Sequence, residues 1–77
     1  MTLEQVIDNI KKIVVSEDFT KDVICAFEDY NFEGKTEVIV SNDEANPNID
    51  YQAYVNHKDA PIICIKITND KVDAWEA

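Results

Sequence analysis

The spacing of apolar residues changes partway through the chain, and this change limits the possible folds more than any other feature. Before Lys35, apolar residues recur three and four positions apart, which is typical of helices with one buried face. After Lys35, apolar and polar residues alternate over short runs, which is typical of half-buried strands. The strands expected from this alternation are residues 36–42, 49–56, 62–68 and 71–76. Asn69-Asp70 separates the last two runs and has the composition of a two-residue hairpin turn.

The N-terminal part of the chain predicts a helix followed by a short strand. Thr2 and Gln5 have the spacing of a capping box, and the helix that they start is expected to span residues 2–11. The next residues, Ile13 to Val15, are all β-branched. Such a run favours a strand over a continuation of the helix, since β-branched side chains lose rotamer freedom in a helix.

A second helix is expected after Thr20, whose hydroxyl can cap its first turn, and Gly34 is the expected stop. Because short connections join the later strands, the sheet should be an antiparallel meander with both helices on one face. The predicted fold class is α+β, with two helices packed on a mostly antiparallel sheet of about five strands in the order α-β-α-β-β-β-β. With 77 residues the chain is expected to form a single domain, residues 1–77.

The charge balance limits the possible binding partners. Sixteen acids face seven lysines, arginine is absent, and the formal net charge is −9. Binding to nucleic acid depends on Lys and Arg displacing counterions, so this chain should be repelled by DNA, RNA and anionic membranes. The excess acid can serve solubility alone, or it can match a partner protein with a strongly basic groove. The segment MTLEQVIDNIKK lacks the features of a signal peptide, and we expect a cytoplasmic protein.

The sequence offers no catalytic constellation, and we expect neither enzyme activity nor a small-molecule substrate. His57 is the only histidine, and no cysteine or serine is spaced to suggest a triad with it. Metal-ligand spacings and phosphate-binding glycine loops are also absent, so no metal or cofactor is expected. Cys25 and Cys64 belong to no C-x-x-C pair and are expected to be buried free thiols.

Two neighbouring features are the candidates for partner binding. Ser16, Glu17 and Asp18 follow the expected strand of residues 13–15, and their oxygens could accept hydrogen bonds that a partner otherwise donates to phosphates. Beside them, apolar residues of the second helix face the sheet and form either ordinary core or a cleft that accepts a side chain from outside. The residues of this apolar set are Val23, Ala26, Phe27, Val38, Val40 and Ile65.

The order of these features resembles that of the uracil-DNA glycosylase inhibitors, small acidic phage proteins that mimic DNA. The resemblance rests on IVVSEDF (13–19), TEVIVSND (36–43), DAP (59–61) and IICIKITND (62–70), and it covers roughly residues 2–70. It implies that Glu17, flanked by Ser16 and Asp18, lies in the enzyme's DNA groove as part of an acidic edge strand. It also implies that the apolar set captures the side chain with which the glycosylase extrudes uracil, in a 1:1 protein complex.

Phe27 and Tyr54 depart from the family pattern because they are larger than the aliphatic residues usual at comparable places. Two other readings of the sequence remain open. One is an acidic decoy against a CRISPR effector, a restriction enzyme or a nuclease, which shares the charge but does not need the apolar cleft. The other is a small housekeeping domain whose acids provide only solubility, in which case the acids should be scattered over the whole surface.

Overall fold

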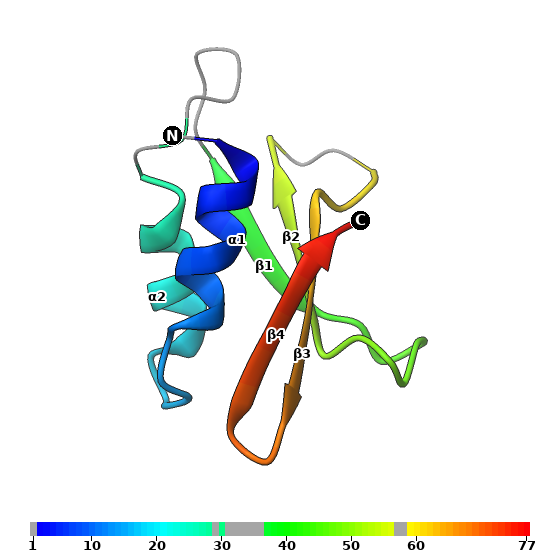
Figure 1. Cartoon of the computed structure of the whole chain (residues 1–77). Helices are drawn as coiled ribbons and strands as arrows, with labels where there is room; N and C mark the ends of the chain where they lie inside the picture. Colours follow the sequence, from blue (N-terminus) through cyan, green and yellow to red (C-terminus); the bar gives the residue numbers. More distant parts are fainter. Residues whose placement is uncertain (1, 29, 31–36, 57–58) are drawn as a thin grey trace.

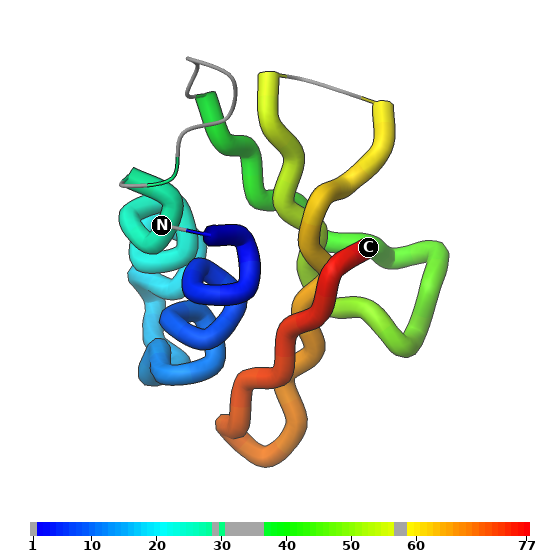
Figure 2. Tube along the Cα trace, turned by 45° about the horizontal axis from the view of Figure 1, so that its top comes forward, coloured from blue at the N-terminus to red at the C-terminus, as the bar shows by residue number. Residues whose placement is uncertain are grey.

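Two helices precede four strands in the computed structural model, which describes residues 2–28, 30, 37–56 and 59–77. The elements are α1 (Leu3–Lys11), α2 (Phe19–Ala26), β1 (Val38–Asn42), β2 (Tyr51–Val55), β3 (Ile63–Thr68) and β4 (Lys71–Glu76). Both helices lie on the same side of the sheet (Figure 1, Figure 2). The α+β class is confirmed, and the sheet has four strands in the described part of the chain rather than about five.

Helix α1 begins with the expected capping box. The Thr2 hydroxyl accepts a hydrogen bond from the Gln5 backbone N–H at 3.2 Å, and the Gln5 side chain accepts one from the Thr2 N–H at 2.8 Å. These two bonds satisfy N–H groups that the first turn leaves without helical partners. Val6 and Ile10 lie on the buried face of α1 and are fully buried, as the helical spacing requires.

The segment from Ile13 to Val15 is not a strand, contrary to the prediction. It connects α1 to α2 and has no strand partner among the described residues. Ile13 and Val15 pack against the core, whereas Val14 between them is 79% exposed. The run therefore alternates locally as a strand would, but a strand also needs hydrogen bonds to a neighbour. Here the chain must pass from one helix to the next within seven residues, and it does so without joining the sheet.

Helix α2 starts earlier and ends sooner than expected. Its N-cap is Asp18, whose side chain makes no capping hydrogen bond, and Thr20 lies inside the first turn. The C-cap is Phe27, so Tyr30 follows the helix instead of belonging to it, and its N–H donates to the Phe27 carbonyl at 3.0 Å. Gly34, the expected stop, lies outside the described residues.

The sheet is the expected antiparallel meander, in the order β1-β2-β3-β4. The last three strands start and end within two residues of the expected bounds. Asn69 and Asp70 have φ angles of 52° and 62°, and two successive positive values are the mark of a type I′ hairpin turn. The prediction of this hairpin is therefore confirmed.

The two faces of the sheet have different surroundings. Helix α1 packs against β4 and α2 packs against β1, and both cover the same face. The buried residues alternate along β2 and β4, as one-sided burial requires, whereas Ile63, Cys64 and Ile65 of β3 are all buried. The main buried residues of this core are Val6, Ile10, Phe19, Val23, Phe27, Ala53, Ile63, Ile65, Val72 and Ala74. Neither helix covers the opposite face, which we call the open face of the sheet.

Candidate partner-binding surfaces

Ser16, Glu17 and Asp18 form an exposed turn between the helices and not the end of an edge strand. The Ser16 hydroxyl accepts a hydrogen bond from the Asp18 N–H at 3.2 Å, and the Ser16 carbonyl accepts one from the Phe19 N–H at 3.1 Å. These bonds fix the backbone at the start of α2 and do not use the two carboxylates. The three predicted acceptors are thus adjacent and exposed, but the backbone that carries them is a turn.

The carboxylates of Glu17 and Asp18 have no hydrogen-bond or ion-pair partner within the described ranges of the chain. Both lie at the N-terminal end of α2, where the helix dipole favours negative charge. Val14, a short distance earlier, adds an exposed apolar side chain to the same connection. The exposure of Val14 was not predicted, because the run of residues 13–15 was expected to form a strand of the sheet.

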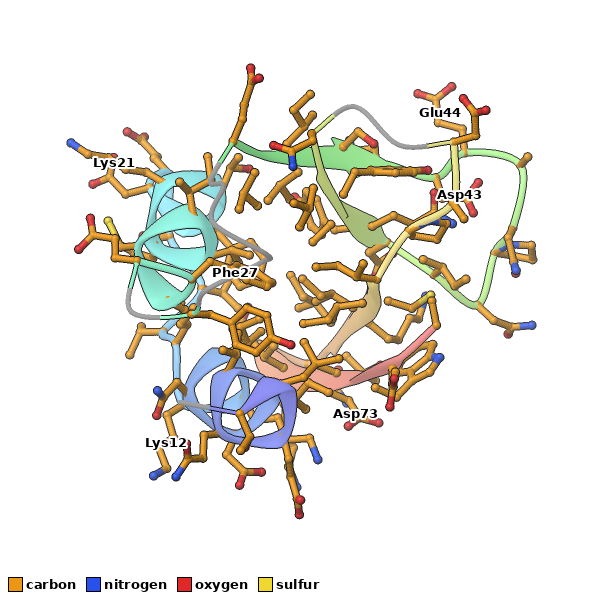
Figure 3. The ribbon with its side chains drawn as sticks, turned by 90° about the horizontal axis from the view of Figure 1, so that it is seen from above. Lys12, Lys21, Phe27, Asp43, Glu44 and Asp73 are labelled. Carbon is orange, nitrogen blue, oxygen red and sulfur yellow. The ribbon has the colours of Figure 1, made fainter. Side chains whose placement is uncertain are left out.

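The six residues of the apolar set lie together, as part of the hydrophobic core. Val23 and Ile65 are fully buried and Phe27 is 3% exposed. Ala26, Val38 and Val40 are partly buried and pack against the same cluster. The Phe27 ring points into the space between the helices and the sheet (Figure 3). An outside side chain could reach these residues only if α2 moved away from the sheet.

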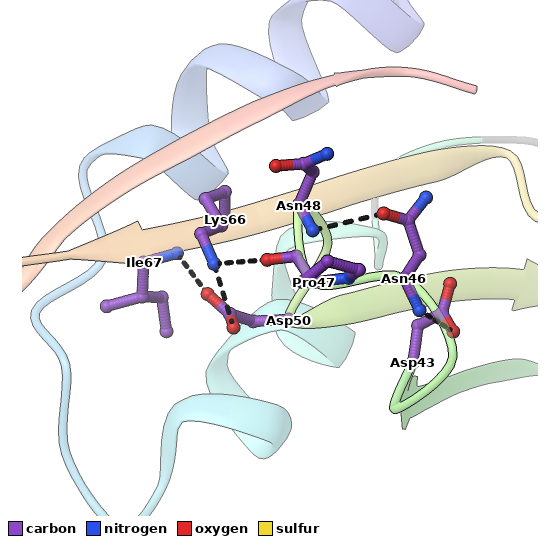
Figure 4. Close-up of polar contacts among 7 residues, drawn as sticks. All are labelled: Asp43, Asn46, Pro47, Asn48, Asp50, Lys66 and Ile67. Carbon is purple, nitrogen blue, oxygen red and sulfur yellow. Dashed lines mark hydrogen bonds and ion pairs between the residues drawn. The ribbon is translucent and has the colours of Figure 1, made fainter.

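The loop between β1 and β2 is held by its own polar side chains. Asp50 Oδ2 accepts a hydrogen bond from the Ile67 N–H at 2.7 Å, and Lys66 Nζ contacts Asp50 Oδ1 at 3.4 Å and the Pro47 carbonyl at 2.9 Å (Figure 4). Asp43 Oδ1 accepts bonds from the backbone N–H groups of the two residues that follow Glu44. An open cavity of about 430 Å³ lies beside this loop, but its aspartates are engaged in these internal contacts.

The open face of the sheet carries a row of side chains that the sequence analysis did not select. By the pairing register, Gln52 faces Cys64 and Cys64 faces Trp75, so one row crosses the last three strands. Tyr54 lies on the same face and donates a hydrogen bond to the side chain of Gln52. Trp75 is 37% exposed, which makes it one of the few large hydrophobic residues at the surface of the described chain. The alternation of residues 49–56, 62–68 and 71–76 predicts which side chains share this face as well as which side chains face the core.

The two cysteines are free thiols in different environments. Cys64 is buried, as expected, and burial raises the pKa of its thiol, with a smaller contribution from the negative charge of Asp43. Cys25 is exposed on α2, so the prediction that it is buried is wrong. It neighbours Ile24, which is also exposed, because both point away from the side of α2 that carries Val23.

Comparisons with known proteins assign no family to this chain. A scan against protein-family models found no match, and searches of curated proteins and of solved structures found none either. The resemblance to the uracil-DNA glycosylase inhibitors therefore rests only on the residues that carry it.

Neither a metal site nor a membrane-spanning helix is found in the described part of the chain. No group of three or more His, Cys, Asp or Glu side chains there could hold a metal ion. Neither helix that the structure describes is long and apolar enough to cross a membrane. His57, the residue considered for catalysis, lies outside the described residues.

Proposed function

We propose that this protein is a stoichiometric inhibitor of a DNA-binding enzyme and acts by DNA mimicry, with uracil-DNA glycosylase as the first target to test. The observation that carries the proposal is the excess of unpaired acidic side chains. Among the described residues, ion pairs join only Lys11 to Asp73 and Lys66 to Asp50. Most of the surface carboxylates are therefore available to a partner that presents cations and N–H groups.

The turn of Ser16, Glu17 and Asp18 is the proposed phosphate-like element. Its two carboxylates are exposed and unpaired in the described part of the chain, so binding a partner would break no internal contact. Bonds from backbone amides or cationic groups to carboxylates are about twice as strong as neutral ones. The preceding Val14 can add apolar contact area at the same place.

The apolar set gives less support to inhibition of uracil-DNA glycosylase than the acidic turn does. Capture of a uracil-extruding side chain needs an open pocket beside α2, and the residues expected to line it are buried in the core. This observation favours the second candidate, an acidic decoy against another nucleic-acid enzyme such as a nuclease, a restriction enzyme or a CRISPR effector. Such a decoy needs the charge and the acidic turn but not the pocket.

A uracil-excision assay tests the proposal directly. The purified protein is titrated into uracil-DNA glycosylase acting on a single-stranded uracil-containing oligonucleotide. We expect excision to fall to background near one equivalent of inhibitor. Undiminished excision at molar excess excludes the glycosylase, and the same titration against a restriction enzyme and a nuclease then tests the second candidate.

A matched pair of charge reversals tests the contact. Glu17→Lys should weaken inhibition by roughly 10-fold or more, because it replaces a charge-assisted acceptor with a repelling cation. Asp8→Lys makes the same change in net charge on the exposed side of α1 and should weaken inhibition much less. Equal losses from the two variants would mean that only net charge matters and that the turn is not the contact.

A further inference from the structure

The sheet has two outer strands, β1 and β4, and each has one side without a neighbouring strand in the described part of the chain. Such a free edge presents a row of backbone N–H and C=O groups. A second polypeptide can bind to this row as an added strand, provided that the groups are not already engaged. The two edges of this sheet differ in that respect.

Two hydrogen bonds show which backbone groups of β1 point outward. The Asn56 N–H donates to the Glu37 carbonyl at 2.9 Å, and the Asp43 N–H donates to the Asp50 carbonyl at 3.3 Å. Bonded pairs recur at every second residue of an antiparallel pair, so the odd-numbered residues between these two bonds also direct their backbone groups toward β2. The residues whose N–H and C=O groups point away from β2 are Val38, Val40 and Asn42.

Nothing in the described part of the chain blocks this edge. The three outward N–H and three outward C=O groups have no hydrogen-bond partner there. Charged residues and proline, which commonly protect free edges, are absent from β1. Among the described strands, β1 is also the one without a buried residue, although Val38, Ile39 and Val40 are apolar. An added strand would cover these side chains and pair the backbone at the same time.

The edge of β4 is protected by contrast. The Ala77 N–H donates to the Ile62 carbonyl at 3.1 Å, so the same alternation directs the backbone groups of Ala74 outward. The Ala74 N–H is engaged by its own neighbour, since it donates to Asp73 Oδ1 at 2.9 Å. Lys11 Nζ of α1 lies 4.0 Å from the same oxygen. Three of the six residues of β4 are charged, so β1 is the edge that remains open to a partner strand.

We propose that the free edge of β1 is a docking site for an extended segment of a partner protein. This segment pairs antiparallel to β1 and carries a lysine or arginine near its N-terminal end, where it reaches Asp43 and Glu44. The occupant is a polypeptide because a main chain offers donors and acceptors at the strand repeat of about 7 Å. Antiparallel pairing is the more stable arrangement per residue. The inference goes beyond the proposed function, because it concerns main-chain pairing and not a DNA-like surface.

The side chains of the partner segment follow from what lies beside the edge. A residue opposite Val38 or Val40 points to the same side of the sheet, where both valines pack against the core, so it should be apolar. The cation follows from the charges at the end of β1. Glu44 is exposed, and neither Asp43 nor Glu44 forms an ion pair within the described ranges.

The lysines of the described chain do not neutralise this end of β1. The ammonium of Lys66 contacts Asp50 and the Pro47 carbonyl. Figure 3 shows Lys12 and Lys21 projecting from the helices, away from Asp43 and Glu44. A second copy of the chain is the less suitable occupant, because two molecules with a net charge of −9 repel one another and β1 itself contains no cation.

NMR titration of the full ¹⁵N-labelled chain tests the site. The probe is a peptide of alternating valine and threonine with two lysines at its N-terminal end, N-methylated at the threonines so that only one edge of the peptide can pair. We expect the amide signals of Val38, Val40 and Asn42 to shift, and their hydrogen exchange to slow by roughly threefold or more at saturation. The same peptide N-methylated at every residue keeps the side chains without N–H donors, and it should bind at least about tenfold more weakly.

Protein variants test the backbone and the charge separately. Asn42→Pro removes one outward N–H of β1 and should weaken binding by roughly threefold or more, whereas Glu76→Pro removes one at the edge of β4 and should not. Glu44→Gln should weaken binding by roughly two- to fivefold, and Glu4→Gln, with the same net charge, should have a smaller effect. Far-UV circular dichroism confirms that each variant is folded.

Four results would overturn the inference. They are absence of binding at millimolar peptide, equal binding of the fully methylated peptide, shifts confined to β4 or the helices, and equal losses from the two proline variants. Shifts at β1 that depend on protein concentration alone would also overturn it, because they indicate that a second copy occupies the edge. No enzyme takes part in this titration, so its failure and the failure of the proposed function are distinguishable.

Discussion

At the scale of single residues, the clearest contrast is between the two thiols. Cys25 and Cys64 have no partner cysteine, yet one is exposed on a helix and the other is buried beneath the open face of the sheet. Burial disfavours the thiolate, and Asp43 adds a negative charge that disfavours it further, so the pKa of Cys64 is raised. Reactivity and pH dependence should follow from these environments.

We predict that a thiol reagent modifies Cys25 at least about tenfold faster than Cys64, because a buried thiol reacts only after local opening. Equal labelling rates for the two cysteines would contradict the structure.

The raised pKa of Cys64 also links the stability of the protein to pH. Because the folded-state pKa of the Cys64 thiol lies above its unfolded value, the contribution of this thiol to stability is fully present below the ordinary thiol pKa of about 8.5. The contribution is lost as the pH rises from that value through the folded-state pKa. Unfolding measured between neutral and alkaline pH should show the decline, and Cys64→Ala should reduce it.

At the scale of elements, the two helices begin in different ways. Helix α1 has a complete capping box, whereas α2 starts at Asp18 with no side-chain capping bond. The hydroxyl of Thr20, expected to cap α2, lies within the helix because the preceding turn already sets the start of the helix. The capping box of α1 could be predicted from sequence spacing, because Thr2 and Gln5 are three residues apart and hydrogen-bond to each other.

Two threonine substitutions test this difference. Thr2→Ala should lower the free energy of unfolding by about 1 kcal/mol, since it removes the acceptor for the Gln5 N–H. For a domain of this size, that corresponds to a thermal midpoint lower by roughly 4–8 °C. Thr20→Ala should leave stability unchanged or raise it slightly, because alanine is the better helix former. Similar losses from both substitutions would show that Thr20 has a capping role after all.

At the scale of the whole molecule, a net charge of −9 is confined to a globule with a radius of gyration of 11.5 Å. Among the described residues only two lysine–carboxylate pairs offset it, so the carboxylates repel one another across the surface. The small core must overcome this repulsion as well as the entropy of the chain. The same charge is what makes a basic partner attractive.

We predict that sodium chloride stabilises this protein, because salt screens the repulsion between exposed carboxylates. Raising the salt from about 0.02 M to about 0.5 M shortens the screening length from roughly 20 Å to roughly 4 Å and should raise the thermal midpoint by several degrees. Neutralising Glu4 and Asp8 together should reduce the response. A midpoint that falls with salt would indicate that attractive ion pairs outweigh the repulsion.

Local patterns in the sequence determined the α+β class, the capping box of α1 and the hairpin at Asn69-Asp70, because each depends on residues close together in the chain. The exposure of Ser16 to Asp18 was also foreseeable from their polarity. Tertiary structure decided whether the run of residues 13–15 joined the sheet, since a strand exists only with a partner.

The tertiary structure also decided that Val23, Phe27 and Ile65 pack as a closed core, and that Cys64 and Trp75 meet on the open face. Apolar spacing shows which side of an element is buried. What covers that side depends on how the helices cross the sheet, and no local pattern contains that information.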